Sequence, residues 1–215
     1  MSMNQITFAL AKGRLAEKAM NILKGLGITC KEMETDTRKL LFTSDDGNYH
    51  FFLAKASDVP TYVDHGVADI GIVGKDTILE ENREVYEVLD LGFGKCMMAV
   101  AGEPCKKELL QSGQLIRVAT KYPLIAKHYF EQTQRSVEII KLHGSVELGP
   151  IVGLSDVIVD IVESGKTLKE NGLVVHEEIE PLSARCIVNS ASFKVKHEEI
   201  NTLIKQIDAR LGDQK

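Results

Sequence analysis

Short apolar runs alternate along this chain with longer amphipathic stretches. "ITFALA" (6–11) is followed by apolar residues at helical spacing over 14–27, and "ADIGIVG" (68–74) is followed by "DTILEEN" (76–82). The second half repeats the alternation with "LIRVAT", "PLIAKHYFEQ", "SVEIIKLHG", "SVELGPIVG" and "VIVDIV". Strands that alternate with helices in this way are typical of α/β proteins with largely parallel sheets. The pattern therefore predicts the α/β class.

Two stretches interrupt the alternation and look like crossover segments. They are "LDLGFGKCMMAVAG" near residue 92 and "EEIEPLSARCIVNSAS" near residue 182, and a final amphipathic helix follows the second. A chain that leaves one lobe, builds another and returns forms two lobes joined twice, with a central cleft whose walls both contact a ligand. We expect a discontinuous lobe I, 1–91 plus 183–215, and a lobe II, 92–182.

The composition narrows the class of partner and the compartment. The 215 residues carry a formal net charge of −5, which gives no reason to expect nucleic acid as the main partner. No apolar run approaches the roughly 20 residues needed to span a bilayer, and the N-terminus does not resemble a signal peptide. The four cysteines are scattered without a CxxC pair, as expected for reduced thiols. We expect a cytoplasmic protein without a membrane partner.

The stretch "DVIVDIVESGKTL" places an acid inside an apolar strand and a small, hydroxyl-rich turn after it. Along a strand Asp156, Ile158 and Asp160 share one face. Ligands bind beyond the carboxyl ends of parallel strands, where Ser164–Leu168 lies, and such a turn suits a phosphate. An acid just upstream suits ribose hydroxyls or Mg²⁺, so a phosphoribosyl group would fit. The alternative is an ordinary capped helix with Asp160 as a polar edge residue.

Three other turns carry groups that can meet a ligand. Lys12 and Arg14 flank Gly13 at a helix start, where cations oppose the helix dipole and phosphate oxygens would explain them. Gly71 lies in a strand, which indicates either an approaching ligand or tight packing. Glu147 opens a short helix and either lines a cleft or compensates the dipole. The alternative interpretation of Lys12 and Arg14 is that they are ordinary solvent-exposed surface cations.

Several long motifs, in order, resemble those of the ATP phosphoribosyltransferase family. They are "FALAKGRL", "DVPTYVDHGVADIGIVGKD" and "LHGSVELGPIVGLSDVIVDIVESGKTLKENGL", and the resemblance covers nearly the whole chain. It implies a fold like that of the two-lobed periplasmic-binding proteins. It also implies that ATP and 5-phosphoribosyl 1-diphosphate (PRPP) are condensed, with Mg²⁺, to N1-(5-phosphoribosyl)-ATP and diphosphate. That glycosyl transfer, by a pentosyltransferase, is the first step of histidine biosynthesis.

The resemblance also assigns roles to residues. It implies that PRPP is bound by Asp156, Asp160, Ser164, Gly165, Lys166, Thr167 and Leu168. Asp156 and Asp160 would also hold the Mg²⁺ that is bound to PRPP. It implies nucleotide binding by Lys12, Gly13, Arg14, Lys55, Asp69 and Gly71. The catalytic candidates are Lys12, Arg14 and Glu147. Lys55 departs from the arginine that the family often carries there, and lysine lacks the bidentate fork.

Because the chain ends at Lys215, it resembles the short form of the family. That form is implied to build on a catalytic dimer and to join a regulatory subunit resembling histidyl-tRNA synthetase in a hetero-octamer. A rival hypothesis is a two-lobed small-molecule binding or sensing protein without catalysis. A second rival is a phosphoribosyltransferase for another base, but its usual pair of adjacent acids before TxGGT is not matched by "VDIVESGKTL".

Overall fold

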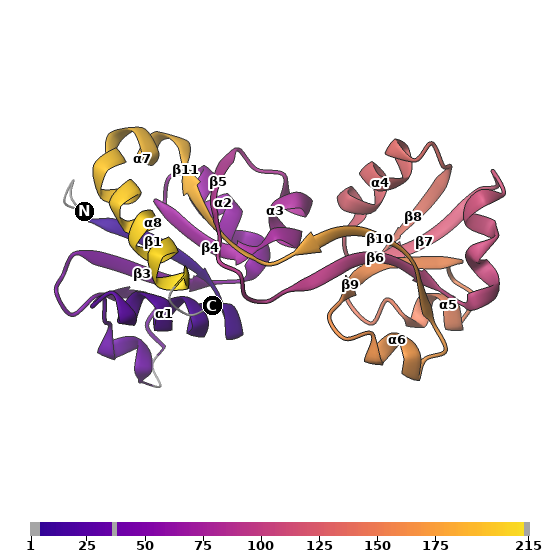
Figure 1. The fold of residues 1–215 in the computed structure, drawn as a ribbon, viewed down its shortest axis with the longest axis horizontal. Coiled ribbons are helices and arrows are strands. Elements are labelled where there is room, and N and C mark those ends of the chain that lie inside the picture. The colour runs from indigo at the N-terminus through magenta and orange to yellow at the C-terminus, as the bar shows by residue number, and fades with distance from the viewer. Residues whose placement is uncertain (1–4, 36–37, 213–215) are drawn as a thin grey trace. The chain divides into compact units, whose positions relative to one another are not determined.

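The computed structural model describes residues 5–35 and 38–212 (Figure 1). It divides into two compact units, which we call the first lobe, Met1–Gly94 with Ser183–Lys215, and the second lobe, Lys95–Leu182. The two stretches interpreted as crossover segments are largely β-structure, since each includes the end of one strand and the whole of the next around the point where the chain changes lobe. No helix in the described part of the chain has the length and apolar character to cross a membrane.

The first lobe contains a six-stranded sheet in the order β2-β3-β1-β4-β11-β5 among the described residues. Its strands are β1 Ile6–Ala11, β2 Leu41–Thr43, β3 Tyr49–Ala54, β4 Ile70–Gly74, β5 Val85–Asp90 and β11 Ala184–Asn189. β1 pairs parallel with β3 and β4, and the other pairings are antiparallel. The helices are α1 Arg14–Gly25, α2 Val59–Asp64, α3 Lys75–Glu81, α7 Ser190–Val195 and α8 His197–Gly212, with 3₁₀ turns η1 Lys31–Glu34 and η2 Ala56–Asp58.

The alternating side chains of β1 build a core on each face of this sheet. Phe8 and Leu10 pack in one cluster with apolar residues of α1 and α8. Ala9 and Ala11 point to the opposite face, where they pack in a second cluster with residues of α2. A strand covered on both faces is apolar throughout, which is why "ITFALA" reads as a continuous apolar run.

The second lobe contains a five-stranded sheet in the order β10-β6-β9-β7-β8. Its strands are β6 Cys96–Gly102, β7 Ile116–Thr120, β8 Val137–Lys141, β9 Val157–Val162 and β10 Val174–Leu182. β7 pairs parallel with β8 and β9, whereas β6 is antiparallel to β9 and β10. The helices are α4 Pro123–Gln132, α5 Leu148–Ile151 and α6 Lys166–Glu170, with 3₁₀ turns η3 Pro104–Lys107 and η4 Leu109–Gln111.

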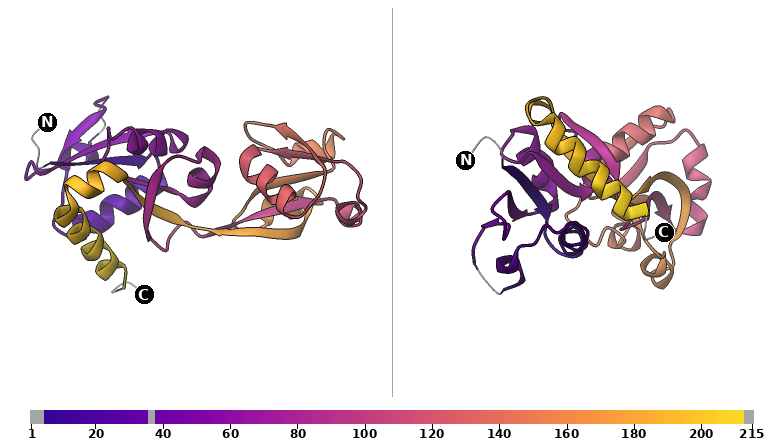
Figure 2. Two further views of the ribbon diagram at one scale, coloured as in Figure 1. Left: turned by 90° about the horizontal axis from the view of Figure 1, so that it is seen from above. Right: turned by 60° about the vertical axis from the view of Figure 1, so that its left-hand side comes forward.

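The two sheets repeat one topology. The order β3-β1-β4-β11-β5 in the first lobe matches β8-β7-β9-β6-β10 in the second, with the same parallel and antiparallel pairings. Both sheets are seen from two further directions in Figure 2. The segments that follow β1 and β4 therefore correspond to those that follow β7 and β9. All four lie at the carboxyl ends of parallel strands, the edge where α/β proteins bind ligands.

Candidate functional site

A cavity of about 260 Å³ lies in the second lobe at the carboxyl end of β9. Its lining includes Asp160 and Ile158 of β9, together with Ala99 and Ala101 of β6. In the β6–β9 pairing Ala99 is opposite Asp160 and Ala101 is opposite Ile158. Because both partners on β6 are alanines, they leave space over the sheet beside the Asp160 carboxylate. The strand register thus creates the cavity and places an acid in it.

The turn after β9 forms another wall of this cavity. Ser164, Gly165, Lys166, Thr167 and Leu168 all line it. Gly165 has φ 69°, in the left-handed region that favours glycine. The Ser164 hydroxyl oxygen accepts a 3.4 Å hydrogen bond from the Lys166 N–H. The structure therefore brings the whole predicted turn together with Asp160.

Lys166 is the charged residue of this turn, and its ammonium group is exposed. Its side chain is 80% exposed, and its ammonium nitrogen lies 3.8 Å from a carboxylate oxygen of Glu170 one helical turn on. Exposed ion pairs of this kind contribute well under about 1 kcal/mol, so the ammonium is easily recruited by an anion.

Two carboxylates give the cavity its electrostatic character. Burial raises the pKa of Asp160 most, and the charge of Glu147, which also lines the cavity, raises it further. A hydrogen bond from the Ile161 backbone N–H and the charge of Lys121 act in the opposite direction and lower it. A partly buried acid with a raised pKa in a cavity, as Asp160 is, is typical of functional sites. Together Asp160 and Glu147 can accept hydrogen bonds from hydroxyl groups or neutralise a shared cation.

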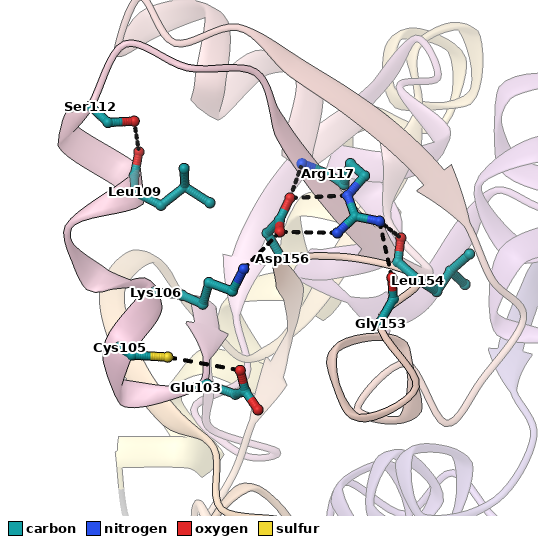
Figure 3. A network of polar contacts seen from close by, with 9 residues as sticks. All are labelled: Glu103, Cys105, Lys106, Leu109, Ser112, Arg117, Gly153, Leu154 and Asp156. Carbon is teal, nitrogen blue, oxygen red and sulfur yellow. Dashed lines mark hydrogen bonds and ion pairs between the residues drawn. The ribbon is translucent and has the colours of Figure 1, made fainter.

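Asp156 is not part of this cavity. Its carboxylate accepts hydrogen bonds from Arg117 Nε at 3.2 Å, Arg117 Nη2 at 3.1 Å, the Arg117 backbone N–H at 3.0 Å and Lys106 Nζ at 3.0 Å (Figure 3). Burial raises the pKa of Asp156, but the hydrogen bonds from Arg117 and Lys106 outweigh it and lower the pKa to about 2. Asp156 precedes β9, four residues and about 13 Å of strand before Asp160. The shared strand face was predicted from sequence, but not the separation along the strand.

In the first lobe, Lys12 and Lys55 come together at the carboxyl ends of β1 and β3. The Lys12 backbone N–H donates a 2.9 Å hydrogen bond to the carbonyl of Ala54, which precedes Lys55. Both lysines line a cavity of about 430 Å³ whose other walls include Phe52 and Tyr62. This cavity combines two cations with aromatic surface, the features that phosphate groups and a nucleobase require.

The turn after β1 depends on a glycine. Gly13 has φ 97° and ψ −150°, a backbone conformation that essentially only glycine adopts. Arg14, the first residue of α1, is exposed and directly follows this turn. Neither Gly13 nor Arg14 lines the cavity of Lys12 and Lys55. Of the three residues in this turn, only Lys12 therefore contributes to that cavity.

Asp69 and Gly71 lie away from this edge, and each has a structural role: Asp69 is held by a hydrogen bond and an ion pair, and Gly71 lies in tight packing. Asp69 precedes β4; it accepts a 2.8 Å hydrogen bond from the Thr7 N–H, and its oxygens lie 2.9 and 3.0 Å from Lys196 Nζ. At Gly71 a Cβ atom would lie 2.8 Å from Val63 Cγ2 and 2.9 Å from Ile187 Cγ1. Of the two interpretations left open for Gly71, tight packing is therefore the one that the structure supports.

The sequence reasoning missed two features of the second-lobe site. It treated the alanines of "CMMAVAG" as part of a connection, although they face Asp160 and Ile158 across the β6–β9 pairing. It also passed over Lys121, whose charge acts on Asp160. The sequence could have pointed to Lys121 because it directly follows the strand "RVAT", and residues after parallel strands lie at the ligand-binding edge.

Comparison with known proteins decides the family. A family model described as "HisG: ATP phosphoribosyltransferase" matches residues 55–209. The chain belongs to the ATP phosphoribosyltransferase family. The ATP phosphoribosyltransferase of Lachnoclostridium phytofermentans is 64% identical over 207 residues, which cover 95% of this chain and 96% of that protein. The ATP phosphoribosyltransferase of Ruminiclostridium cellulolyticum is 56% identical over 211 residues, which cover 98% and 99%.

Solved structures agree with the family and the fold. An ATP phosphoribosyl transferase (HisG:HisZ) complex from Thermotoga maritima contains a chain with a TM-score of 0.82 and 35% identity, covering 97% of this chain and 100% of that one. The crystal structure of Tv2483 bound to L-arginine has a TM-score of 0.58 at 13% identity, covers 98% of this chain and 85% of that one, and shows a shared fold alone. The predicted two-lobed, periplasmic-binding-protein-like α/β fold is confirmed, as is the predicted family. ATP phosphoribosyltransferases catalyse the first step of histidine biosynthesis, and the chain is a transferase of this kind.

Proposed function

We propose that the second-lobe cavity binds PRPP, whose phosphoribosyl group is transferred to N1 of the adenine of ATP. The observation that carries this proposal is the cavity itself, which joins the half-buried Asp160 carboxylate to the turn Ser164–Leu168 within about 260 Å³. A carboxylate suits sugar hydroxyls and a glycine-containing turn suits a phosphate, and a phosphoribosyl group presents both.

The 5′-phosphate of PRPP is assigned to the turn Ser164–Leu168. The hydroxyl groups of Ser164 and Thr167 and the backbone N–H groups at the start of α6 donate hydrogen bonds to its oxygens. Gly165 supports this assignment because it has no Cβ and adopts φ 69°, so the backbone can approach an anion closely. Lys166 also lines the cavity, and its exposed ammonium adds a positive charge beside the phosphate.

Asp160 and Glu147 are assigned to the ribose side of PRPP and to its Mg²⁺. Among the residues that the structure describes, no group of three or more His, Cys, Asp or Glu side chains is arranged to hold a metal. Mg²⁺ is commonly held by one or two carboxylates together with substrate phosphates, and the two acids of this cavity fit that pattern. Bound Mg²⁺ would neutralise charge on the diphosphate, while Asp160 orients the ribose hydroxyls. Asp156 is left out, because Arg117 and Lys106 occupy its carboxylate.

The nucleotide is assigned to the first lobe, at Lys12, Gly13, Arg14 and Lys55. Lys12 and Lys55 share a cavity that also has aromatic walls, and Arg14 follows two residues later. Adenine N1 carries a lone pair and attacks the ribose C1, from which diphosphate departs. The developing positive charge on the sugar and negative charge on diphosphate call for positioning and electrostatic stabilisation by the protein. Lys12 and Arg14 supply cations for the phosphates, and Glu147 is the acid available near the sugar.

The experiment that tests the PRPP site compares two variants of neighbouring residues in α6. Thr167→Val removes a hydroxyl from the cavity wall with little change in volume, and Lys169→Ala changes an exposed residue that does not line it. We expect Thr167→Val to weaken PRPP and ribose 5-phosphate binding about tenfold, as for a lost hydrogen bond to a charged group, and Lys169→Ala to change neither. Unaltered binding of both ligands to Thr167→Val, measured by calorimetry, would sink the phosphate assignment.

A second subunit is proposed as well. The Thermotoga maritima relative was solved as a HisG:HisZ complex, which supports a short-form catalytic chain that works with a regulatory subunit resembling histidyl-tRNA synthetase. We infer a catalytic dimer that joins this partner in a hetero-octamer. Native mass spectrometry of the chain mixed with the candidate subunit tests this, and a catalytic chain that shows no mass change on mixing would contradict it. Turnover of ATP and PRPP by the mixture separates the enzyme from a sensor that only binds.

A further inference from the structure

We propose that Lys121 binds the 1-diphosphate of PRPP, an inference that rests on the function proposed above. Lys121 directly follows β7, the strand between β8 and β9 in the second sheet. Nothing in the family motifs described above includes it. Three observations support the inference: its position directly after the strand that pairs with β9, the lack of an ion pair on its charge within the described residues, and its correspondence with Lys12.

The strand register places Lys121 on the cavity side of the sheet. β7 and β9 run parallel, with Ala119 opposite Ile158 and Thr120 opposite Val159. β7 ends at Thr120, and continuing its register by one residue would set Lys121 opposite Asp160. Ala119 and Ile158 pack in one cluster on the face that carries the cavity, and side chains two residues further along a strand return to the same face. Lys121 therefore follows Ala119 toward the side on which Asp160 lies.

Side-chain hydrogen bonds hold this turn in place. The Thr120 hydroxyl donates a 2.6 Å hydrogen bond to the Val159 carbonyl and accepts a 2.8 Å hydrogen bond from the Tyr122 N–H. The Thr120 side chain is thus bonded to β9, and the backbone just after Lys121 is bonded to the same Thr120 hydroxyl. A lysine on a fixed turn presents its charge to the neighbouring strand end with less loss of backbone entropy on binding.

The ammonium of Lys121 is available to an anion. The side chain is exposed, and within residues 5–35 and 38–212 it forms no ion pair at 4.0 Å or less. Its nitrogen lies 5.6 Å from the ring centroid of Tyr122, a contact that an exposed site makes weak. Its charge already acts on Asp160, where it opposes the larger effect of burial. With Asp160 and Glu147 both negative, a cation beside them lowers the repulsion that a diphosphate would otherwise meet.

The repeated topology gives Lys121 a counterpart. β1 in the first lobe corresponds to β7 in the second, and Lys12 directly follows β1 as Lys121 directly follows β7. Lys12 lies beside Lys55 at an edge suited to phosphate groups. The same position in the two sheets therefore carries a lysine at the ligand-binding edge.

The chemistry of PRPP decides which anion Lys121 meets. PRPP has a phosphate at C5 and a diphosphate at C1, on opposite sides of the ribose hydroxyls. The turn after β9 takes the 5′-phosphate and Asp160 takes the hydroxyls. The anion still without a cation from this lobe is the diphosphate, and Lys121 is the cation that follows β7 and whose charge acts on Asp160.

A matched control exists on the neighbouring strand. Lys141 ends β8 and pairs with Thr120, so its side chain points to the face opposite that of Ala119 and Lys121. Calorimetry on the full chain, with PRPP–Mg²⁺ and with ribose 5-phosphate, compares Lys121→Met, Lys121→Arg and Lys141→Met. Lys121→Met is expected to weaken PRPP binding about tenfold or more, as for loss of a charge-assisted hydrogen bond, and to leave ribose 5-phosphate binding unchanged. Lys121→Arg should restore most of the PRPP affinity, and Lys141→Met should change neither ligand.

The outcomes separate this inference from the function on which it rests. Equal PRPP affinity for Lys121→Met and the unmodified chain overturns it. An equal loss for both ligands overturns it too, because Lys121 would then act on the ribose or the 5′-phosphate. If Thr167→Val weakens both ligands but Lys121→Met weakens neither, the PRPP site stands and the Lys121 assignment fails. If the unmodified chain binds neither ligand, the proposed PRPP site itself fails.

Discussion

Replacing Asp156 by asparagine should destabilise the second lobe and leave PRPP binding intact. The Asp156 side chain is only 11% exposed, and three hydrogen bonds from Arg117 and one from Lys106 reach its carboxylate. Asparagine keeps the shape but loses the charge and one acceptor oxygen. Arg117 keeps its hydrogen bonds to the carbonyls of Gly153 and Leu154, so the cation is not left without partners.

The size of the effect follows from the pKa of Asp156. Its lowering from 3.8 to about 2 corresponds to roughly 2 kcal/mol of stability at neutral pH. Lys106 and Arg117 are 35% and 41% exposed, so solvent screening reduces this to about 1–2 kcal/mol. Because the folded pKa lies below the unfolded one, the unfolded chain binds the proton first as the pH falls. The contribution is complete above about pH 4 and is lost as the pH falls toward 2.

Urea unfolding followed by circular dichroism measures this prediction. At pH 7 we expect a lower midpoint for the second-lobe transition in Asp156→Asn, and at pH 2 we expect the difference from the unmodified chain to shrink. Asp160→Asn is the matched comparison with the opposite pattern. Burial raises the pKa of Asp160, so its ionised form is unfavourable in the folded state, and a neutral amide should keep or raise stability. That variant should lose PRPP affinity about tenfold, as for a lost charged hydrogen bond. The reasoning is refuted if Asp156→Asn unfolds like the unmodified chain but binds PRPP more weakly.

Two further predictions concern packing and thiols. Gly71→Ala should destabilise the first lobe by about 1–3 kcal/mol in urea unfolding, because the new methyl would meet Val63 and Ile187 at 2.8 and 2.9 Å; unchanged stability would contradict the packing role. Burial raises the pKa of Cys186 to about 12, so a thiol reagent should modify exposed Cys105 quickly at pH 7 and Cys186 only after unfolding. Rapid native-state labelling of Cys186, located by mass spectrometry, would contradict that burial.

The parallel strands could be predicted from the sequence because their pattern is local. The apolar runs 6–11 and 157–162 coincide with β1 and β9. The stretches "CMMAVAG" and "ARCIVN" were interpreted as connections, although they form β6 and β11. Each of these strands pairs antiparallel in its sheet and is not part of the alternation of strands and helices along the sequence. Its own residues do not distinguish such a strand from an extended linker.

The site was predictable where its residues are adjacent in sequence. Asp160 and the turn Ser164–Leu168 lie within nine positions, and the rule for the carboxyl ends of parallel strands brings them together. Asp69 and Asp156 are acids of the same kind at the other end of their strands. Their partners lie far off along the chain, as Lys196 does from Asp69, and only the fold brings them into contact. Composition and spacing cannot distinguish an acid that meets a ligand from one that meets a distant lysine.

These two acids form one repeated device, which explains why each precedes a central strand. The backbone N–H of Asp69 donates to the Thr7 carbonyl at 2.9 Å, and that of Asp156 donates to the Arg117 carbonyl at 2.8 Å. In return each carboxylate accepts a hydrogen bond from the N–H of the same partner, at 2.8 and 3.0 Å, and a lysine of the same lobe adds an ion pair. The device fastens the amino ends of β4 and β9 to the neighbouring strands in both sheets. Because these acids are already paired with a backbone N–H and a lysine, substitutions at them should act on stability. Substitutions at the carboxyl ends, where Asp160 lies, should act on substrate binding.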